Sequence, residues 1–299
     1  MKPYYLIMFL PILANSTDSS SREKLAKQAA RISENTFVVL ESRHHGMFSI
    51  LDDVMSLLYA YEKKQIAGLE VDFGSGGLYY DSKHGPNWFS YYFEPVTLGR
   101  SSGDLVRTLY LPYSYDEEIK KLGLNTIDHI EFSNVDKHKV NRLIKKYIKI
   151  KPFIENEVSS FVTKCFKHHY MIGVHFRGTD KISEAMRTPY ETVKHAIDQL
   201  VKKNNLSDYG IFVATDEEDF INYMRENYKD ICYQDAIRST TGRPIHFDNE
   251  DPFKAGEDAL VDAILLSKTN FLIRTSSNLS RWSTYFNPDL PVLELSKRK

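Results

Sequence analysis

The stretch YMIGVHFRGTDK, residues 170–181, joins a mostly apolar run to a dense group of polar side chains. Residues 170–176 predict a buried strand. Arg177, Asp180 and Lys181 follow it directly. In an open parallel sheet, ligands bind outside the carboxyl ends of the strands. This stretch therefore predicts both a strand of an α/β sheet and a binding site at the end of that strand.

Strands and helices alternate through the rest of this part of the chain. Further strands are predicted at 210–215, 270–275 and 291–295, and helices at 190–203, 217–227 and 257–268, with a short helix before the last strand. Nearly continuous apolar strands that alternate with helices indicate a parallel sheet covered by helices on both faces. The predicted fold class is α/β, with a parallel sheet in the C-terminal half.

A second α/β region precedes this one. Residues 36–42 and 67–73 predict strands on either side of a helix within 44–64, which has apolar residues on one face. The aromatic segment that follows, 79–93, could stack on sugar rings or belong to the core. We therefore expect three parts: a hydrophobic segment and polar stalk (1–34), an N-terminal α/β half (35–150) and a C-terminal α/β half (151–299).

The composition excludes some classes of function. The chain has 42% apolar and 26% charged residues, which is typical of a soluble globular protein, and its net charge of −1 gives no overall attraction to nucleic acid. The helix expected at 139–150 has a basic face, which could bind nucleic acid but is more often simply solvated, so we expect no nucleic-acid partner. Cys165 and Cys232 allow one disulfide at most, and neither has the spacing of a zinc ligand.

The first residues leave the cellular compartment open. Residues 4–14 form an apolar run that is too short to span a bilayer and has the length of the apolar region of a signal peptide. The alternative is a hydrophobic arm packed on the protein. A signal would place the protein in the secretory lumen (Golgi or endoplasmic reticulum) or outside the cell, and without one the protein is cytoplasmic. Any membrane association is expected only through residues 4–14.

Three predicted strands end in polar clusters, HFRGTDK (175–181), ATDEED (214–219) and RTSSNLS (274–280). Arg177 offers a planar fork of donors for two phosphate oxygens, although an ion pair with Asp180 or another nearby acid would explain it equally. Ser276 and Ser277 begin a helix, where the dipole favours an anion, although plain N-capping is the alternative. Together the clusters predict a diphosphate pocket.

Asp262 lies within the apolar helix expected at 257–268. A carboxylate there is costly to bury unless it is paired, and it could accept two N–H groups from the edge of a guanine. The alternative is that it faces solvent beside Asp258. The glycine-rich segment FGSGG (73–77) lacks the spacing of a dinucleotide-binding or P-loop motif, so the sequence argues against both of those classes.

Several segments, in the same order, resemble a known superfamily. They are IGVHFRGTDK (172–181), FVATDEEDF (212–220) and GEDALVDAILLSKTNFLIRTSSNLSRW (256–282), together with residues 37–73 and YYFEPV (91–96). From about residue 36 the chain resembles the fucosyltransferases that include the nodulation fucosyltransferase, the core α1,6-fucosyltransferase and the protein O-fucosyltransferases. The likeness covers most of the chain, with the weakest part from 100 to 135.

The resemblance implies two Rossmann-like halves of GT-B type, with a donor cleft between them. It implies inverting transfer of fucose from GDP-fucose to a hydroxyl of a glycan or glycoprotein, with no cofactor and no required metal. Arg177 would contact the donor diphosphate, His175 and Asp262 the guanine, and Ser276 and Ser277 the phosphates. The acidic pair Asp216–Glu217 corresponds to one placed near the acceptor.

The catalytic residues implied by the resemblance follow Arg177. Lys181 and Glu184 correspond to a lysine and a glutamate of the core-fucosylating enzyme, with one residue fewer before Glu184 here. Glu184 is our first choice for the base that accepts the proton of the acceptor hydroxyl, and Asp180 is the second. Gly178 stands where some members carry a second basic residue. Two alternatives remain: transfer from another GDP-sugar, or binding of nucleotide or glycan without catalysis.

Overall fold

The computed structural model describes residues 32–99, 104–108, 130, 132, 134–178, 187–236, 238–239 and 251–295. The chain forms two compact units, each assembled from separate segments. Unit 1 comprises Met1–Ser42, Asp52–Asp72 and Val96–Ser133, and unit 2 comprises Arg43–Leu51, Phe73–Pro95 and Asn134–Lys299. Residues 43–51, 73–95 and 134–150, which we expected in the N-terminal half, therefore group with unit 2. The donor cleft expected between two halves stays a prediction.

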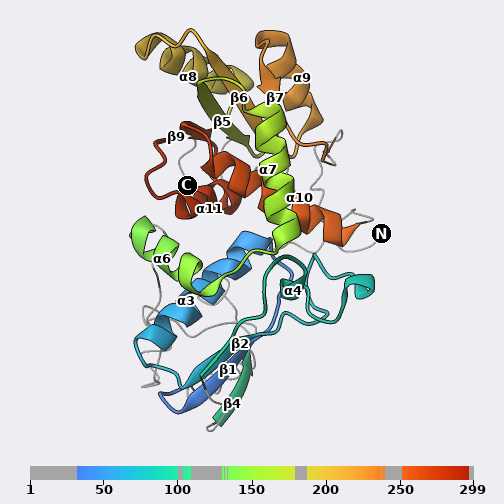
Figure 1. Cartoon of the computed structure of the whole chain (residues 1–299), viewed down its shortest axis with the longest axis vertical. Coiled ribbons are helices and arrows are strands. Elements are labelled where there is room, and N and C mark those ends of the chain that lie inside the picture. Colours follow the sequence, from blue (N-terminus) through green and yellow to red (C-terminus); the bar gives the residue numbers. More distant parts are fainter. Residues whose placement is uncertain are drawn as a thin grey trace, which may run out of the picture. The chain divides into compact units, whose positions relative to one another are not determined.

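Unit 1 contains a four-stranded sheet in the order β3-β2-β1-β4. Figure 1 labels β1, β2 and β4 of this sheet. Its strands are β1 (Thr36–Leu40), β2 (Gly68–Val71), β3 (Thr97–Gly99) and β4 (Asp104–Thr108). Strand β1 is parallel to β2 and β4, whereas β2 and β3 are antiparallel. Helix α3 (Met47–Glu62) connects β1 to β2 and buries Val54, Met55 and Leu58. The β-α-β unit expected at the start of the fold is thus confirmed.

Unit 2 is built on a five-stranded sheet in which all strands are parallel, in the order β7-β6-β5-β8-β9. The strands are β5 (Tyr170–Phe176), β6 (Tyr209–Thr215), β7 (Ile231–Cys232), β8 (Phe271–Arg274) and β9 (Val292–Glu294). The helices are α4 (Phe89–Tyr92), α6 (Lys137–Tyr147), α7 (Pro152–Cys165), α8 (Tyr190–Lys203), α9 (Glu218–Asn227), α10 (Pro252–Ser267) and α11 (Asn278–Phe286), with a 3-10 turn at Ser82–His84. The parallel sheet predicted for the C-terminal half is confirmed.

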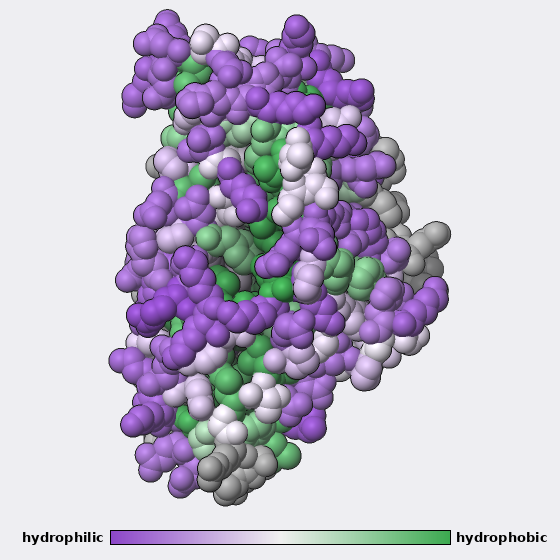
Figure 2. Space-filling view, in the orientation of Figure 1, coloured by the Kyte–Doolittle hydropathy of each residue, from purple (hydrophilic) through white to green (hydrophobic). Residues whose placement is uncertain are grey.

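Helices cover both faces of this sheet. On one face, α8 and α9 pack on alternate strand residues such as Val174 and Val213. Their outer surfaces are largely hydrophilic, as the upper part of Figure 2 shows. On the other face, Phe212 contacts Phe161 of α7, and Gly173 leaves no room for a side chain beneath Thr269, just beyond α10. The residues of β5 that face α10 therefore include His175, because side chains alternate along a strand.

The aromatic segment 79–93 belongs to the core of unit 2. Trp88, Phe89 and Tyr92 are fully buried, and the Trp88 ring lies 4.6 Å from that of Phe73. The Trp88 indole nitrogen donates a 2.9 Å hydrogen bond to the main-chain oxygen of Gly76. Of the two interpretations of this segment, core packing is the one that the structure supports.

Helix α7 and strand β7 were not anticipated from the sequence. Helix α7 buries only Ile154 and Val158 fully, so its apolar pattern is weak, although Pro152 at its first turn is a typical helix start. Cys165 at its end and Cys232 at the end of β7 are free thiols, with 4.0 Å between Cys232 Sγ and the Cys165 main-chain oxygen.

Within the described ranges, no helix has the length and apolar character needed to cross a membrane.

Candidate functional site

The three polar clusters predicted from the sequence follow neighbouring strands. His175 of β5 pairs with Ala214 of β6 on one side and with Arg274 of β8 on the other. Because β6, β5 and β8 are parallel and adjacent, their carboxyl ends form one continuous edge. The residues that follow these strands are therefore close together in space, as the sequence predicted.

Arg177 is tied to both neighbouring strand ends. Its main-chain nitrogen donates a 2.9 Å hydrogen bond to Thr275 Oγ1, and its Nε lies 3.2 Å from Asp216 Oδ2. Asp216 Oδ1 in turn accepts a hydrogen bond from the main-chain nitrogen of Gly178. The ion pair anticipated for Arg177 thus includes Asp216. A guanidinium held by a carboxylate behind it is oriented before any ligand arrives, because its position is already restricted.

Thr275 begins the segment that leads into helix α11. Ser276 and Ser277 are both buried, and Ser277 is the N-cap residue of this helix. Among the described residues, the Ser277 hydroxyl accepts no capping hydrogen bond, so ordinary side-chain N-capping does not account for Ser277. The first main-chain N–H groups of α11 and the positive end of its dipole favour an anion at this place.

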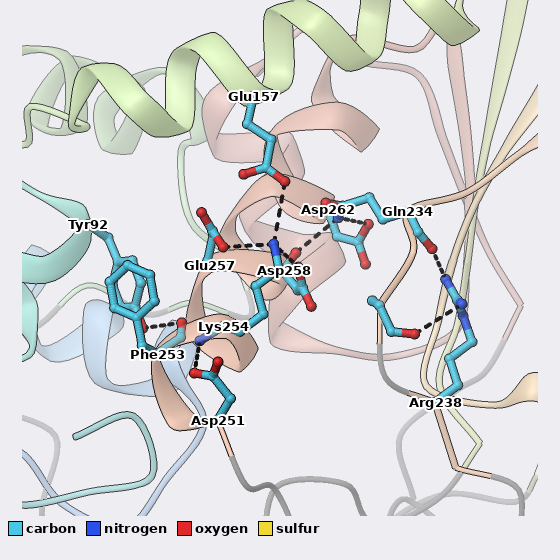
Figure 3. Close-up of polar contacts among 11 residues, drawn as sticks. Tyr92, Glu157, Gln234, Arg238, Asp251, Phe253, Lys254, Glu257, Asp258 and Asp262 are labelled. Atoms are coloured by element: carbon cyan, nitrogen blue, oxygen red, sulfur yellow. Dashed lines mark hydrogen bonds and ion pairs between the residues drawn. The ribbon is translucent and has the colours of Figure 1, made fainter. Parts of the chain in front are cut away.

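Asp262 lies in α10 and is bound from the side by Gln234, as Figure 3 shows. Gln234 Nε2 lies 2.5 Å from Asp262 Oδ1 and 3.2 Å from the main-chain oxygen of Asp258. Burial raises the pKa of Asp262 to about 7, although the Gln234 bond and the nearby Arg238 charge oppose this shift. Asp262 is a half-buried residue whose carboxyl group is surrounded by protein. The interpretation that it simply faces solvent is therefore wrong.

Arg238 completes this network and was not anticipated from the sequence. Its Nη2 donates a hydrogen bond to the main-chain oxygen of Gln234 (Figure 3). Its Nη1 lies 3.8 Å from Glu218 Oε2 at the start of α9. The next residue, Ser239, forms main-chain hydrogen bonds with Asp216 and Glu218. This segment therefore joins the end of β6 to the carboxylate on α10. Gln234 and Arg238 belong to a stretch without regular periodicity, so no sequence pattern identified them.

Glu217, next to Asp216 in the sequence, is buried, and its carboxylate is hydrogen-bonded to other side chains of the protein. Its Oε2 accepts hydrogen bonds from Arg187 Nη2 at 2.9 Å and from the Tyr190 hydroxyl at 2.7 Å. Burial and the bond to Glu217 both raise the pKa of Tyr190, so the phenol remains a donor at neutral pH. The acceptor role predicted for Asp216 and Glu217 stays a prediction, and the structure places both carboxylates against arginines.

A second polar cluster joins α7 to the first turns of α10 (Figure 3). Lys254 Nζ lies 2.7 Å from Glu257, 2.9 Å from Asp258 and 3.6 Å from Glu157 of α7. Burial raises the pKa of Glu157 and of Asp258, and the Lys254 charge opposes both shifts. Burial also lowers the pKa of Lys254, but its hydrogen bonds to Glu257 and Asp258 outweigh this and raise it. This cluster links two helices on one face of the sheet.

Asp180, Lys181 and Glu184, the residues expected to carry catalysis together with Arg177, lie outside the described residues. Of the remaining predicted residues, the strand edge brings together His175, Arg177, Asp216, Glu217, Ser276 and Ser277. In the part of the chain that the structure describes, no three His, Cys, Asp or Glu side chains are arranged to hold a metal ion.

No family model matches the chain. Its fold, however, is that of solved fucosyltransferases. NodZ α-1,6-fucosyltransferase soaked with GDP-fucose is 20% identical, with a TM-score of 0.58 over 88% of this chain and 98% of that one. NodZ from Bradyrhizobium superposes with the same TM-score at 19% identity, over 88% of this chain and 98% of that one. A mutant of FUT1 from Arabidopsis thaliana in complex with GDP is 14% identical, with a TM-score of 0.54 over 93% of this chain and 75% of that one.

These comparisons define a fold class, α/β and similar to that of GT-B-like fucosyltransferases, with a mixed sheet in one unit and a parallel sheet in the other. The resemblance predicted from the sequence motifs is thereby confirmed at the level of the fold.

Proposed function

We propose that this protein is a glycosyltransferase that moves fucose from GDP-fucose to a hydroxyl group of a glycan or protein. The observation that carries the proposal is the bond between Arg177 and Thr275, which holds a carboxylate-oriented arginine beside the start of α11 at the edge of a parallel sheet. The arginine and the N-terminus of α11 are both suited to binding a diphosphate. Complexes of similar folds with GDP-fucose or GDP support a guanine nucleotide.

The guanine would be held by Asp262 and His175. A carboxylate can accept two N–H groups from the edge of guanine, whereas adenine and uracil offer no such pair of donors to it. Gln234 fixes Asp262 in one orientation, and His175 faces the side of the sheet that α10 covers. The donor would therefore place its base against α10 and its diphosphate near Arg177, Ser276 and the main chain at Ser277.

The chemical step is proposed as a single displacement with inversion at the anomeric carbon. As the bond between the sugar and the diphosphate breaks, negative charge develops on the leaving group, and Arg177 and the N-terminus of α11 stabilise it without a required metal. The acceptor hydroxyl is a weak nucleophile, so a carboxylate on the face opposite GDP accepts its proton. Glu184 is the first choice for this base and Asp180 the second. Lys181 would add positive charge beside the same strand end.

Nucleotide binding is the first test. Calorimetric titration of the full chain with GDP, ADP and UDP, with and without Mg²⁺, is expected to show binding of GDP alone, unchanged by the metal. Arg177→Ala should weaken GDP binding by about 100-fold, since it removes charge-assisted hydrogen bonds. Arg225→Ala, an exposed arginine of α9, is the matched control and should bind as the unmodified protein does. Binding without a preference for guanine, or binding that requires Mg²⁺, would contradict the proposal.

Turnover assays then distinguish transfer of fucose from the two alternatives, which are transfer from another GDP-sugar and nucleotide binding without catalysis. Release of GDP from GDP-fucose on addition of an acceptor identifies a transferase, and competition between GDP-fucose and GDP-mannose identifies the donor sugar. If GDP binds but neither donor turns over with any glycan or peptide acceptor, the protein is a nucleotide-binding relative without catalysis. Loss of turnover in Glu184→Gln with GDP binding retained would support Glu184 as the base.

A further inference from the structure

Position 178, directly after Arg177, has no room for a side chain unless the Glu217 side chain moves. A Cβ atom added to Gly178 would lie 2.1 Å from Glu217 Oε1 and 2.2 Å from Glu217 Cδ. These distances are far below any contact that real atoms adopt. The Glu217 carboxylate therefore occupies the space in which a side chain of residue 178 would begin.

The buried Glu217 carboxylate is partnered by Arg187, a residue just before α8. A buried carboxylate is costly unless it is paired and hydrogen-bonded. Arg187 Nη2 donates a 2.9 Å hydrogen bond to Glu217 Oε2 and so supplies the pairing charge. Arg187 Nη1 lies 3.5 Å from the main-chain oxygen of Gly178. The guanidinium also lies over the ring of Tyr190, with 5.6 Å from its central carbon to the ring centroid. Arg187 is thus held in place next to the residue that follows Arg177.

The exposure of the two partners differs. The Glu217 side chain is 4% exposed, whereas that of Arg187 is 43% exposed. If Arg187 served only to neutralise the buried Glu217, its guanidinium could be buried as well. Instead, much of the Arg187 side chain is exposed to solvent and is accessible to a ligand. Asp216 and Glu217, consecutive at the end of β6, each hold one arginine at the same edge of the sheet. Two oriented guanidinium groups suit a ligand that carries two phosphate groups better than one does.

We propose that Arg187 is a second diphosphate-binding residue of this site, and that Glu217 is a positioning residue that orients it. The inference rests on the proposed function, since it takes the ligand to be a nucleoside diphosphate. Arg177 contacts the diphosphate from the end of β5, and Arg187 contacts it from the segment just before α8. Glu217 acts on the ligand only through Arg187, and Gly178 leaves the adjacent space to the Glu217 carboxylate.

The test compares ligands that differ only in their phosphates. Guanosine, GMP and GDP are titrated into the full chain and into Arg187→Ala, with Arg225→Ala as the matched control. Arg187→Ala is expected to lower the affinity for GDP by about 10- to 100-fold, which is the effect of losing a charge-assisted hydrogen bond. Guanosine affinity should change by less than about twofold, because guanosine has no phosphate. A purely structural role would lower guanosine and GDP affinity by the same factor, which would overturn the proposal.

A second variant guards against loss of folding. Arg187→Ala leaves Glu217 buried without its cation, whereas Arg187→Ala/Glu217→Gln removes both charges and keeps an acceptor for Tyr190. The double variant is expected to unfold at a higher temperature than the single one and still to bind GDP weakly. If it regains normal GDP affinity, Arg187 does not bind the diphosphate. Failure of the unmodified protein to bind GDP would instead contradict the proposed function, so the two failures are distinguishable.

Discussion

Gln234 donates a hydrogen bond of 2.5 Å to Asp262 across 28 positions of the chain, and this contact orients the carboxylate proposed to bind guanine. The same carboxyl group has a pKa raised to about 7 by burial. Near neutral pH it therefore exists as a mixture of a protonated form and an ionised form. Only the ionised form can accept two N–H groups from guanine, so nucleotide affinity should depend on pH.

We expect GDP to bind about tenfold more tightly at pH 8 than at pH 6, since the fraction of ionised Asp262 rises about tenfold across that interval. Asp262→Asn should abolish both this pH dependence and the preference for GDP over ADP. Asp219→Asn, on the exposed side of α9, is the matched control and should leave both unchanged. GDP affinity that stays constant from pH 6 to pH 8 in the unmodified protein would contradict the role of Asp262.

Asp262 also predicts how stability changes with pH. Its pKa in the folded state lies above its value in the unfolded state, so the unfolded chain ionises first as pH rises. Folding stability should therefore fall between about pH 4 and pH 7, by at most about 4 kcal/mol from this group. Asp262→Asn removes this contribution. Urea unfolding at a series of pH values should give a flatter profile for the variant than for the unmodified protein, and identical profiles would refute the expectation.

Thr275→Val tests the link between β5 and β8. Valine has nearly the shape of threonine but offers no acceptor to the main-chain nitrogen of Arg177. We expect a loss of about 1–3 kcal/mol in the free energy of unfolding, the cost of an unsatisfied buried donor. GDP affinity should fall as well, because Arg177 is no longer fixed beside Ser276. Thr275→Ser keeps the hydroxyl and serves as the control in denaturant titrations. Equal stability of the two variants would show that the bond is unimportant.

Gly178→Ala should be destabilising by about 1–3 kcal/mol, because the new methyl group displaces the Glu217 carboxylate. Gly46→Ala is the control, since its added methyl group would meet only the Tyr79 hydroxyl at 3.9 Å. In a double-mutant cycle with Glu217→Ala, the alanine at position 178 should become nearly neutral. Additive effects of the two substitutions would mean that the two positions do not compete for the same space.

Lys254→Met tests the cluster between α7 and α10. Removing the ammonium leaves Glu157, Glu257 and Asp258 facing one another without a cation. We expect a loss of about 1 kcal/mol at pH 8, since the network is partly exposed. The loss should shrink toward pH 5, because carboxyl groups with raised pKa values take up protons there. Lys268→Met at the exposed end of the same helix is the control in thermal unfolding. A loss that grows toward pH 5 would contradict this account.

The sequence predicted the strand edge well because each of its strong signals is local. The residues that follow β5, β6 and β8 stand next to apolar runs, and the topology of a parallel sheet brings them together. The aromatic segment 79–93 could not be decided in this way, since buried and sugar-binding aromatic residues have the same composition. Burial of Trp88 and Tyr92 depends on packing partners elsewhere in the chain.

The partners of the candidate site residues were beyond sequence analysis. Gln234 and Arg187 contact Asp262 and Glu217 across 28 and 30 positions of chain, and both lie outside regular helices and strands. Nothing in their local sequence distinguishes them from other polar loop residues. In the sequence, the nearby Asp258 on the same helix favoured an Asp262 that faces solvent. The hydrogen bonds that Gln234, just after β7, donates to Asp262 and to the main-chain oxygen of Asp258 show that it does not.

The hydrogen bond from Arg177 to Thr275 joins residues 98 positions apart, and this separation has a consequence for folding. Closing so long a loop loses chain entropy before any contact compensates for it, so the pairing of β5 with β8 should be a late step. A refolding chain should regain helical circular dichroism before it regains affinity for GDP. Nucleotide added during refolding would then stabilise only those molecules in which the sheet is already complete.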